Sequence, residues 1–537
     1  MNTHLLNYKD LKTLLIVLFI LLTGFALRSY QASQIEKVPH DDTISYLASA
    51  GHLGDYHRLS NDFSSAPAWV TNATWLSFFE ARDEPLLSNW HTTIQDLQHL
   101  DIHPPLYFLW LNLIMRASPD IEPWTGWLSN TLFYVVNGIM LFMLGRRFIS
   151  RQAALLGLLI WTVSVATIDT SIIARHYEMV VTISLLSTLV LARTVRRQNL
   201  DGLSIVLFGL LTLLGFLTNY QFLYFGLAMS AAILFAHHRQ PGRVFYCGLA
   251  IASGVCSGIW VYPALLDQTA QVQAWSTEPT ASDVLFRLRN TLEELSKFCV
   301  LASLLVLFGI WDRGRRAKGQ PLPFTLIILA GVSCLLIGAA YMSFFSPRHA
   351  MGERYLAVVW PFLALIMGAV VSRYWHYRVY RPVAMVLILL PALLNVAEGD
   401  KNQAPPPRMA HASYVIADFN QRGIWPSIAL LLPAEQMTLV APQSTLLQHQ
   451  QLLTDSAWTA REDGLLISSH ALGANQRSGQ QQLIELLEPT RDLTNLQDFD
   501  RSLDYFEIDL SQAHAENRNK SVIESLSYQA YLSVKIL

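Results

Sequence analysis

Two adjacent acidic residues near the start of the chain are the first groups whose chemistry stands out. Asp41 and Asp42 follow His40, shortly after the first long apolar run. Like charges oppose joint ionisation, so one carboxylate can act as a general base toward an acceptor hydroxyl while the other binds a divalent cation or holds the first in place. The alternative is that Asp41 or Asp42 caps a helix that begins at Thr43. The two readings are compatible, because a helix start is also a fixed place to present an acid.

Arginines beside aromatic residues form a second group. Arg175 precedes His176 and Tyr177, and Arg354 precedes Tyr355. A guanidinium group suits bidentate binding of phosphate. The alternatives are that these arginines reach to lipid headgroups, or that they pair with Glu178 and Glu353, which lie within three residues of them in the sequence.

One histidine completes the set of candidates. His103 lies between Asp101 and the pair Pro104-Pro105, and an apolar, aromatic-rich stretch follows from Leu106 to Met115. The imidazole can donate a hydrogen bond to a lipid phosphate, or it can cap the next helix or contact solvent. The following stretch is too short to cross a bilayer, so we predict a helix that lies in the membrane interface.

Long apolar runs must position these residues. Of the 537 residues, 52% are hydrophobic and only 15% are charged, against about 25% charged in an ordinary soluble domain. Eleven runs approach the roughly 20 apolar residues that a membrane-crossing helix needs. The alternative for the shorter runs is a buried helix of a soluble core. The runs are Thr13–Leu27, Trp124–Leu144, Ala153–Ile173, Met179–Ala192, Leu203–Thr218, Phe222–Ala236, Val244–Leu266, Phe298–Trp311, Phe324–Phe345, Tyr355–Val371 and Val383–Val396.

The basic residues of the short loops predict an orientation. With the N-terminus inside, every loop predicted to be cytoplasmic carries at least two basic residues, which is the usual bias. The first run lacks a small-residue cleavage site and is read as a retained helix. The loops counted as cytoplasmic are Gly145–Arg151, Arg193–Arg197, His237–Arg243, Asp312–Lys318 and Ser372–Arg381.

The predicted architecture is a polytopic α-helical membrane protein with a small soluble domain at its end. Residues 1–396 form the transmembrane domain, in which 28–123 is a first outer loop with interfacial helices and 267–297 a shorter one. Residues 397–537 form a polar domain of α/β type on the outer side. The tail has strand-like runs at Ser427–Leu432, Gly464–Ser468 and Tyr505–Leu510 and a helical one at Gln480–Leu487.

Charge and motif searches exclude several classes. The formal net charge of −2 argues against a nucleic-acid-binding protein. The sequence has no P-loop, no paired-cysteine zinc motif and no nucleophile elbow. All four cysteines fall in predicted membrane spans, so no disulfide framework supports the outer segments.

The order of these motifs resembles the integral-membrane glycosyltransferases of the GT-C superfamily. The likeness covers about residues 10–375 and is greatest to protein O-mannosyltransferases, lipid A aminoarabinose transferases and bacterial sugar transferases of lipopolysaccharide cores. The family more often has Asp-Glu where this chain has two aspartates, and the tail resembles no family that we can name. The matching motifs are Asp41-Asp42-Thr43, His103-Pro104-Pro105-Leu106-Tyr107, Ala174-Arg175-His176-Tyr177, Leu217-Thr218-Asn219-Tyr220, in which Asn219 replaces a histidine, and Arg354-Tyr355 with Pro361.

The resemblance implies a reaction and a set of roles. The expected sugar donor is a sugar on a polyprenyl phosphate, and the acceptor is a glycan, a lipid or a protein at the outer face of a bacterial cytoplasmic (inner) membrane. Asp41 is the expected catalytic base of an inverting transfer, and Asp42 beside it is the second expected catalytic residue and the expected ligand of a divalent cation, Mg or Mn. The phosphate would be bound by His103, Arg175, Tyr177, Arg354 and Tyr355.

Two other functions compete with this one. A transporter or flippase for a lipid-linked sugar would place polar groups and broken helices at the middle of the membrane. The polar residues instead collect at one predicted face. An assembly protein whose tail binds a partner is the other alternative, and its helices would serve only as an anchor.

Overall fold

A computed structural model defines the fold for most of the chain. It describes residues 8–35, 37–81, 84–118, 121–264, 324–344, 353–397, 414–420, 422–454, 464–469, 496–500 and 505–509, with four isolated positions besides. The contacts divide the chain into two units. One comprises 1–56 and 77–403, and the other comprises 57–76 and 404–537. The sequence placed a single boundary at 396/397, whereas the second unit also takes in a segment of the first loop.

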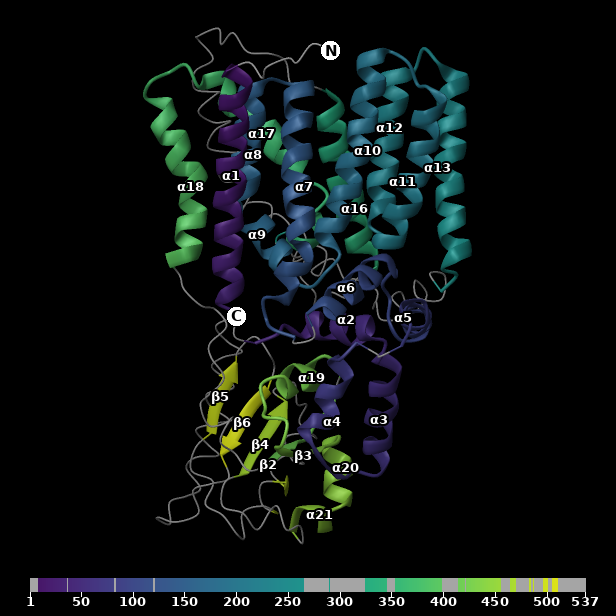
Figure 1. Cartoon of the computed structure of the whole chain (residues 1–537), viewed down its shortest axis with the longest axis vertical. Helices are drawn as coiled ribbons and strands as arrows, with labels where there is room; N and C mark the ends of the chain where they lie inside the picture. The colour runs from purple at the N-terminus through teal and green to yellow at the C-terminus, as the bar shows by residue number, and fades with distance from the viewer. Residues whose placement is uncertain are drawn as a thin grey trace. The chain divides into compact units, whose positions relative to one another are not determined.

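The first unit is a bundle of apolar helices (Figure 1). Ten of the eleven predicted runs overlap described helices, although Ala153–Ile173 is divided between two helices and Val244–Leu266 extends beyond the described residues. The run Phe298–Trp311 lies outside the described residues. The described helices of the bundle are α1 (Tyr8–Ser33), α7 (Thr125–Phe148), α8 (Arg151–Val163), α9 (Val165–Ile172), α10 (Tyr177–Arg197), α11 (Gly202–Thr218), α12 (Phe222–His237), α13 (Pro241–Val261), α16 (Phe324–Phe344), α17 (Trp360–Tyr374) and α18 (Tyr380–Ala397).

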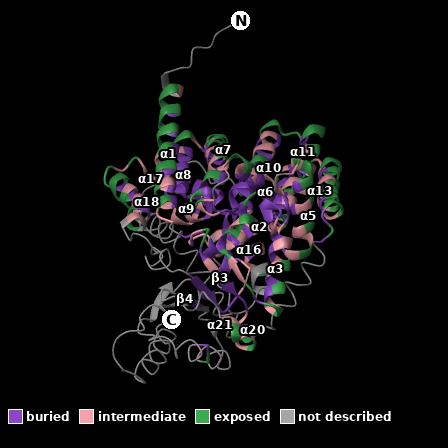
Figure 2. Ribbon diagram, turned by 60° about the horizontal axis from the view of Figure 1, so that its bottom comes forward, coloured by how far each residue is buried: buried purple, intermediate pink, exposed green. Residues whose placement is uncertain are grey.

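The helices have the length and surface of membrane spans. Among the described residues, α1, α7, α10 and α13 are each long and apolar enough to cross a bilayer, and α8 with α9 forms a fifth candidate that is bent by 58°. On α1, apolar side chains such as Leu15 and Phe19 are exposed (Figure 2), which suits contact with lipid. The chain is a polytopic helical membrane protein. The total of eleven crossings stays a prediction.

Small residues allow close helix packing in the middle of the bundle. α8 and α17 pack along each other, and a Cβ atom on Gly368 would lie 2.5 Å from the Ala153 carbonyl oxygen and 2.5 Å from the Gly157 nitrogen. Helices in lipid gain most of their association energy from such close packing. This contact fixes α17, which follows Arg354 in the chain.

Three shorter helices of the first loop lie at one end of the bundle (Figure 1). They are α2 (His40–Ala50), α5 (Leu86–Leu100) and α6 (Leu106–Ala117). α2 packs against both of the others. α6 confirms the predicted helix after His103. The last turns of α7 and α10 lie at the opposite end of the bundle (Figure 1). They are basic, with Arg146 in α7 and Arg197 in α10, and Arg146 is 3.5 Å from Asp10.

A buried arginine joins the two halves of the bent span. Arg28 in α1 is fully buried. Its Nη1 donates to the Thr162 carbonyl oxygen at the end of α8 (2.8 Å), and its Nε donates to the Ser171 hydroxyl in α9 (2.8 Å). Its guanidinium also lies over the Tyr134 ring at 4.3 Å. A charge in lipid must find polar partners inside the protein, and the break between α8 and α9 supplies them.

The second unit contains a mixed six-stranded sheet with the order β1-β3-β2-β4-β6-β5. The parallel centre is β3-β2-β4, and the two edges are antiparallel. This confirms a small α/β domain. The strands are β1 (Trp69–Thr71), β2 (Tyr414–Ala417), β3 (Met437–Val440), β4 (Gly464–Ser469), β5 (Leu496–Asp500) and β6 (Tyr505–Asp509).

The first-loop segment is integral to this sheet. β1 pairs antiparallel with β3, and Trp69 lies opposite Leu439. Helix α4 (Asn72–Leu76) follows, and the buried Trp75 donates from Nε1 to the Thr438 hydroxyl at 3.0 Å. Residues 57–76 therefore complete a core that the tail alone would leave open.

The strand predictions for the tail were right in two places and wrong in one. β4 and β6 confirm the runs at Gly464–Ser468 and Tyr505–Leu510. Ser427–Leu432 is not a strand, because α19 (Ile424–Ala429) covers its start. Every residue from Trp425 to Ala429 is buried, so the segment has no polar face to reveal its period. Most of Gln480–Leu487 lies outside the described residues.

Candidate functional site

The acidic pair lies in the first turn of α2, but it does not cap that helix. Pro39 is the N-cap residue and no side chain caps the helix amides. The hydroxyl of Thr43 donates to the Pro39 carbonyl oxygen at 3.0 Å, and that of Ser45 donates to the Asp41 carbonyl oxygen at 3.2 Å. Both acidic side chains therefore make their contacts elsewhere, and the capping alternative is wrong.

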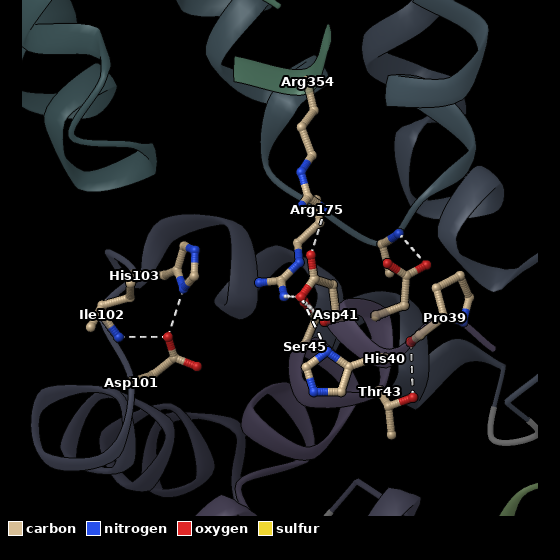
Figure 3. Close-up of polar contacts among 12 residues, drawn as sticks. Pro39, His40, Asp41, Thr43, Ser45, Asp101, Ile102, His103, Arg175 and Arg354 are labelled. Carbon is tan, nitrogen blue, oxygen red and sulfur yellow. Dashed lines mark hydrogen bonds and ion pairs between the residues drawn. The ribbon is translucent and has the colours of Figure 1, made fainter. Parts of the chain in front are cut away.

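Asp41 brings together two arginines from distant parts of the sequence (Figure 3). Arg354 Nη1 lies 2.6 Å from Asp41 Oδ2, and Arg175 Nη2 lies 3.2 Å from Asp41 Oδ1. The Arg175 guanidinium holds the pKa of Asp41 well below its usual range. The carboxylate is about one-third exposed, and His40 Nδ1 lies 3.5 Å from it. The predicted residues Asp41, Arg175 and Arg354 thus meet at one point.

Asp42 occupies a different environment, although it is the next residue. Its side chain is buried, and Oδ2 accepts a hydrogen bond from the Ala174 backbone nitrogen at 2.8 Å. Oδ1 is buried without a hydrogen-bond partner. Burial raises the pKa of Asp42 to about 7. One acid of the pair is therefore firmly ionised and its neighbour is close to its titration point at neutral pH, an arrangement that separates two carboxyl groups by role.

The segment that carries Arg175 is held by α7. The Asn130 side-chain amide donates to the carbonyl oxygens of Ser171 (3.1 Å) and Ile173 (2.7 Å). Gly126 allows close approach, because a Cβ there would lie 2.6 Å from the Ala174 nitrogen. Two residues of α7 thereby fix the turn that presents the Ala174 amide to Asp42 and the Arg175 side chain to Asp41.

A second polar cluster lies beside Arg175. His103 Nδ1 is 2.6 Å from Asp101 Oδ1, which also accepts from the Ile102 nitrogen at 2.6 Å (Figure 3). The His103 and His176 rings lie 5.5 Å apart between centroids. Burial lowers the pKa of His176 well below its usual value, so this ring is neutral. Arg175 Nη1 and His176 Nδ1 are both buried without a hydrogen-bond partner.

The two predicted tyrosines line the same place. The Tyr177 ring is buried and lies 4.7 Å from the His176 ring between centroids. The Arg354 guanidinium lies 5.4 Å from the centroid of the Tyr355 ring. The Tyr177 ring therefore packs on His176, and the Tyr355 ring lies beside the Arg354 guanidinium, where it can make a cation–π contact.

The described residues provide no group of ligands for the metal ion that is predicted at Asp42. They contain no group of three His, Cys, Asp or Glu side chains arranged to hold an ion. The oxygens of Asp41 face two arginines, whose charge opposes a dication. A single carboxylate oxygen at Asp42 is too few for Mg or Mn, which prefer several oxygen ligands. Metal use stays an untested prediction, and no step below depends on it.

Several residues of the site were not singled out from the sequence. Asn130 and Gly126 looked like ordinary members of an apolar run, and His176 was noted only as part of the arginine motif. In the sequence, Asp101 stands out only as a neighbour of His103. A polar amide inside a run that otherwise reads as a membrane span is the signal that could have identified Asn130.

Comparison with known proteins finds a family likeness over part of the chain. Residues 102–262 match the sequence profile of the dolichyl-phosphate-mannose-protein mannosyltransferase family. This region includes His103, Arg175 and Tyr177, but not Asp41 or Arg354. No curated protein matches the chain significantly.

Two solved structures of low sequence identity align with most of the length of this chain. ArnT from Cupriavidus metallidurans bound to undecaprenyl phosphate is 12% identical, with a TM-score of 0.47 over 94% of this chain and 99% of that one. The oligosaccharyltransferase AglB from Archaeoglobus fulgidus, in complex with an inhibitory peptide and a dolichol-phosphate, is 10% identical, with a TM-score of 0.45 over 95% and 75%. The profile match at residues 102–262 confirms the predicted resemblance to GT-C glycosyltransferases, through their dolichyl-phosphate-mannose-protein mannosyltransferase branch.

Proposed function

We propose that the protein is a glycosyltransferase that moves a sugar from a polyprenyl-phosphate donor to the hydroxyl of a glycolipid, polysaccharide or protein acceptor. The observation that carries this proposal is the Asp41 carboxylate placed between the guanidinium groups of Arg175 and Arg354. A site with one ionised carboxylate and two arginines offers a base and an anion-binding pair together. The family match over residues 102–262 supports the same class of reaction.

The residues divide the reaction between them. The Asp41 carboxylate accepts the proton of the acceptor hydroxyl, and the acceptor oxygen bonds to the anomeric carbon. The bond from that carbon to the phosphate oxygen breaks, and the leaving phosphate takes the electron pair. Arg175 and Arg354 stabilise the charge that develops on it. Attack on the face opposite the leaving group inverts the anomeric centre.

Other groups hold these residues in place and complete the phosphate site. Arg175 Nη1 and His176 Nδ1 are buried polar atoms without a partner, and a phosphate oxygen bound by Arg175 would satisfy the first. His103, oriented by Asp101, offers its second ring nitrogen to the same anion. Asp42 fixes the start of α2 to the Ala174 amide, so it acts on the geometry of Asp41.

The proposed location is the outer face of a bacterial cytoplasmic membrane. Helix α2, which carries Asp41, lies at the end of the bundle opposite the basic last turns of α7 and α10 (Figure 1), and basic loops favour the cytoplasm. The donor would reach the site from the surrounding membrane lipid. Cysteine substitutions at exposed Leu87 in α5 and Arg146 in α7 would test this orientation by labelling from one side of intact cells.

A transfer assay tests the reaction directly. Full-length protein in nanodiscs is mixed with synthetic polyprenyl-phosphate sugars and an acceptor extract, and the glycosylated product is detected by mass spectrometry. We expect transfer by the wild type and loss of transfer by Asp41→Asn, with Ser372→Ala at the opposite end of the bundle as a control. Full transfer by Asp41→Asn would mean that the base lies elsewhere.

One structural feature keeps a lipid-linked sugar transporter as the second candidate. The break between α8 and α9, with Arg28 buried beside it, is the kind of interrupted helix that transporters use for binding. The guanidinium nitrogens of Arg28 already donate to Gly24, Thr162, Thr167 and Ser171, which argues for a structural role. Movement of labelled lipid across proteoliposomes, with no chemical change, would favour the transporter.

A further inference from the structure

The Asp41 carboxylate binds Arg175 and Arg354, the two arginines that would bind the donor phosphate in the proposed reaction. Both of its oxygens are in contact, Oδ1 with Arg175 Nη2 and Oδ2 with Arg354 Nη1. The distance of 2.6 Å to Arg354 is that of a strong charge-assisted hydrogen bond. Among the ion pairs of the described residues, Asp41 is the carboxylate that contacts these two arginines.

The pair still has unused binding capacity. Arg175 is 4% exposed, and its Nη1 is buried without a partner. Arg354 is more open, with 38% of its side chain exposed. An anion that reaches Arg354 and the free nitrogen of Arg175 would have to approach Asp41 closely, and the two negative charges would repel each other.

The contact that fills the site also weakens the base. The Arg175 guanidinium favours the ionised form of Asp41, and a carboxylate so stabilised has little tendency to accept a proton from a hydroxyl. Catalysis requires the opposite, namely arginines that face the phosphate and a carboxylate that faces the acceptor.

We propose that the Asp41 carboxylate is an internal substitute for the phosphate, which a polyprenyl-phosphate group must displace from Arg175 and Arg354 before Asp41 can act as base. This inference rests on the proposed function. It predicts ordered binding, with the lipid-linked sugar first and the acceptor second. The exchange partners are chemically alike, since carboxylate and phosphate oxygens both accept from a guanidinium fork.

The same contact would help to release the product. After transfer Asp41 carries the proton of the acceptor hydroxyl and is neutral, so it cannot compete with the polyprenyl phosphate on the arginines. When that proton passes to water, the carboxylate recovers its charge and takes back Arg175 and Arg354. The lipid phosphate then leaves a site in which it meets repulsion.

Binding of farnesyl phosphate to full-length protein in detergent tests the exchange without any transfer reaction. We expect Asp41→Asn to bind this short polyprenyl phosphate about tenfold more tightly than the wild type, which corresponds to the gain of one charge-assisted hydrogen bond. Asp41→Glu keeps the charge and should show no such gain. Farnesol, which lacks the phosphate, should bind all variants equally. Isothermal calorimetry or a thermal shift series gives the affinities.

Two further variants locate the effect. Asp10→Asn is the matched control, because Asp10 pairs with Arg146 rather than with either arginine of the site, and it should bind like the wild type. Arg354→Gln should weaken binding and should cancel the gain when combined with Asp41→Asn. Equal or weaker binding by Asp41→Asn, in protein that still elutes as a single species, would overturn the proposal.

The outcomes separate this inference from the proposed function. If Asp41→Asn binds farnesyl phosphate more tightly but the wild type transfers no sugar, the exchange of carboxylate for phosphate is supported and the transferase activity is rejected. Transfer by the wild type without tighter binding by Asp41→Asn would keep the transferase and reject the exchange. Product inhibition that is independent of Asp41 would contradict its role in release.

Discussion

Arg28 and Arg175 are both buried arginines in the helical unit, and they differ in how completely they are bonded. Arg28 donates from Nε, Nη1 and Nη2 to neutral oxygens and lies against the Tyr134 ring. Arg175 pairs with a partly exposed carboxylate and keeps Nη1 without a partner. A buried cation whose hydrogen bonds are satisfied stabilises the fold, whereas one with an unused nitrogen is available to a ligand. Substitutions should therefore separate stability from activity.

The largest expected effect is the loss of transfer when Arg175 is replaced. Arg175→Gln should lower kcat about a thousandfold, a loss typical of a group that stabilises charge in the transition state. Its melting temperature in detergent should stay within a few degrees of the wild-type value. Transfer kinetics and differential scanning fluorimetry measure the two. A large fall in the melting temperature of Arg175→Gln, with a proportionate loss of activity, would mean that Arg175 stabilises the fold as Arg28 does.

The converse substitution should mainly affect stability. Arg28→Leu leaves the Thr162 carbonyl oxygen and the Thr167 and Ser171 hydroxyls without this partner. We expect a loss of about 3 kcal/mol in the free energy of unfolding, from buried polar groups left unsatisfied. Thermal or denaturant unfolding in detergent gives the value. Protein that folds normally at low temperature should keep most of its farnesyl phosphate binding, and a selective loss of that binding would contradict a structural role.

A smaller effect is expected from the residue that connects the two regions. Asn130→Ala removes the donor to the Ser171 and Ile173 carbonyl oxygens, so the turn before Arg175 loses one of its supports. We expect kcat to fall about tenfold with little change in KM, since misplacement of a stabilising group is felt mainly in the transition state. Asn130→Asp cannot donate and should not restore activity, while Asn130→Gln tests for partial rescue.

The smallest effect is a pH dependence from Asp42. Because its pKa is raised to about 7 in the folded state, the folded protein holds this proton more tightly than the unfolded chain. The stability that results is complete below the ordinary pKa of Asp and is lost as pH rises toward 7. Asp42→Asn should gain about 1 kcal/mol relative to the wild type between pH 6 and pH 7. Melting temperatures at matched pH values measure this, and a constant difference would exclude an Asp42 titration.

The sequence predicted which residues meet at the candidate site better than it predicted the residues that hold them in place. Asp41, Arg175 and Arg354 could be chosen because charged residues are few at the predicted outer ends of the apolar runs, and the structure brings them together. Their mutual contact was not predictable, since it depends on how α9 bends away from α8. The run Ala153–Ile173 reads as one continuous span, whereas the structure bends it by 58° at a break where Arg28 bonds to the Thr162 carbonyl oxygen.

The sequence also did not predict how the chain divides into its two units. The polar segment 57–76 looks like part of an outer loop, and a three-residue strand carries almost no pattern of its own. Its pairing with Met437–Val440 depends on a partner in the distant tail. The strand prediction at Ser427–Leu432 was wrong for a related reason. Every residue from Trp425 to Ala429 is buried, so the apolar pattern there does not distinguish a helix from a strand.

The strand β1 has a consequence for the order of events during synthesis. Trp75 and its partner Thr438 are 363 residues apart in the chain, which at ordinary rates of translation is roughly 20 to 70 s. Throughout that time the membrane helices insert, while Trp75 and the unpaired strand β1 lack the sheet that they pack against. Such a segment is open to wrong partners. We expect nascent chains that stop before residue 404 to depend on a chaperone, and to be degraded faster when none is present.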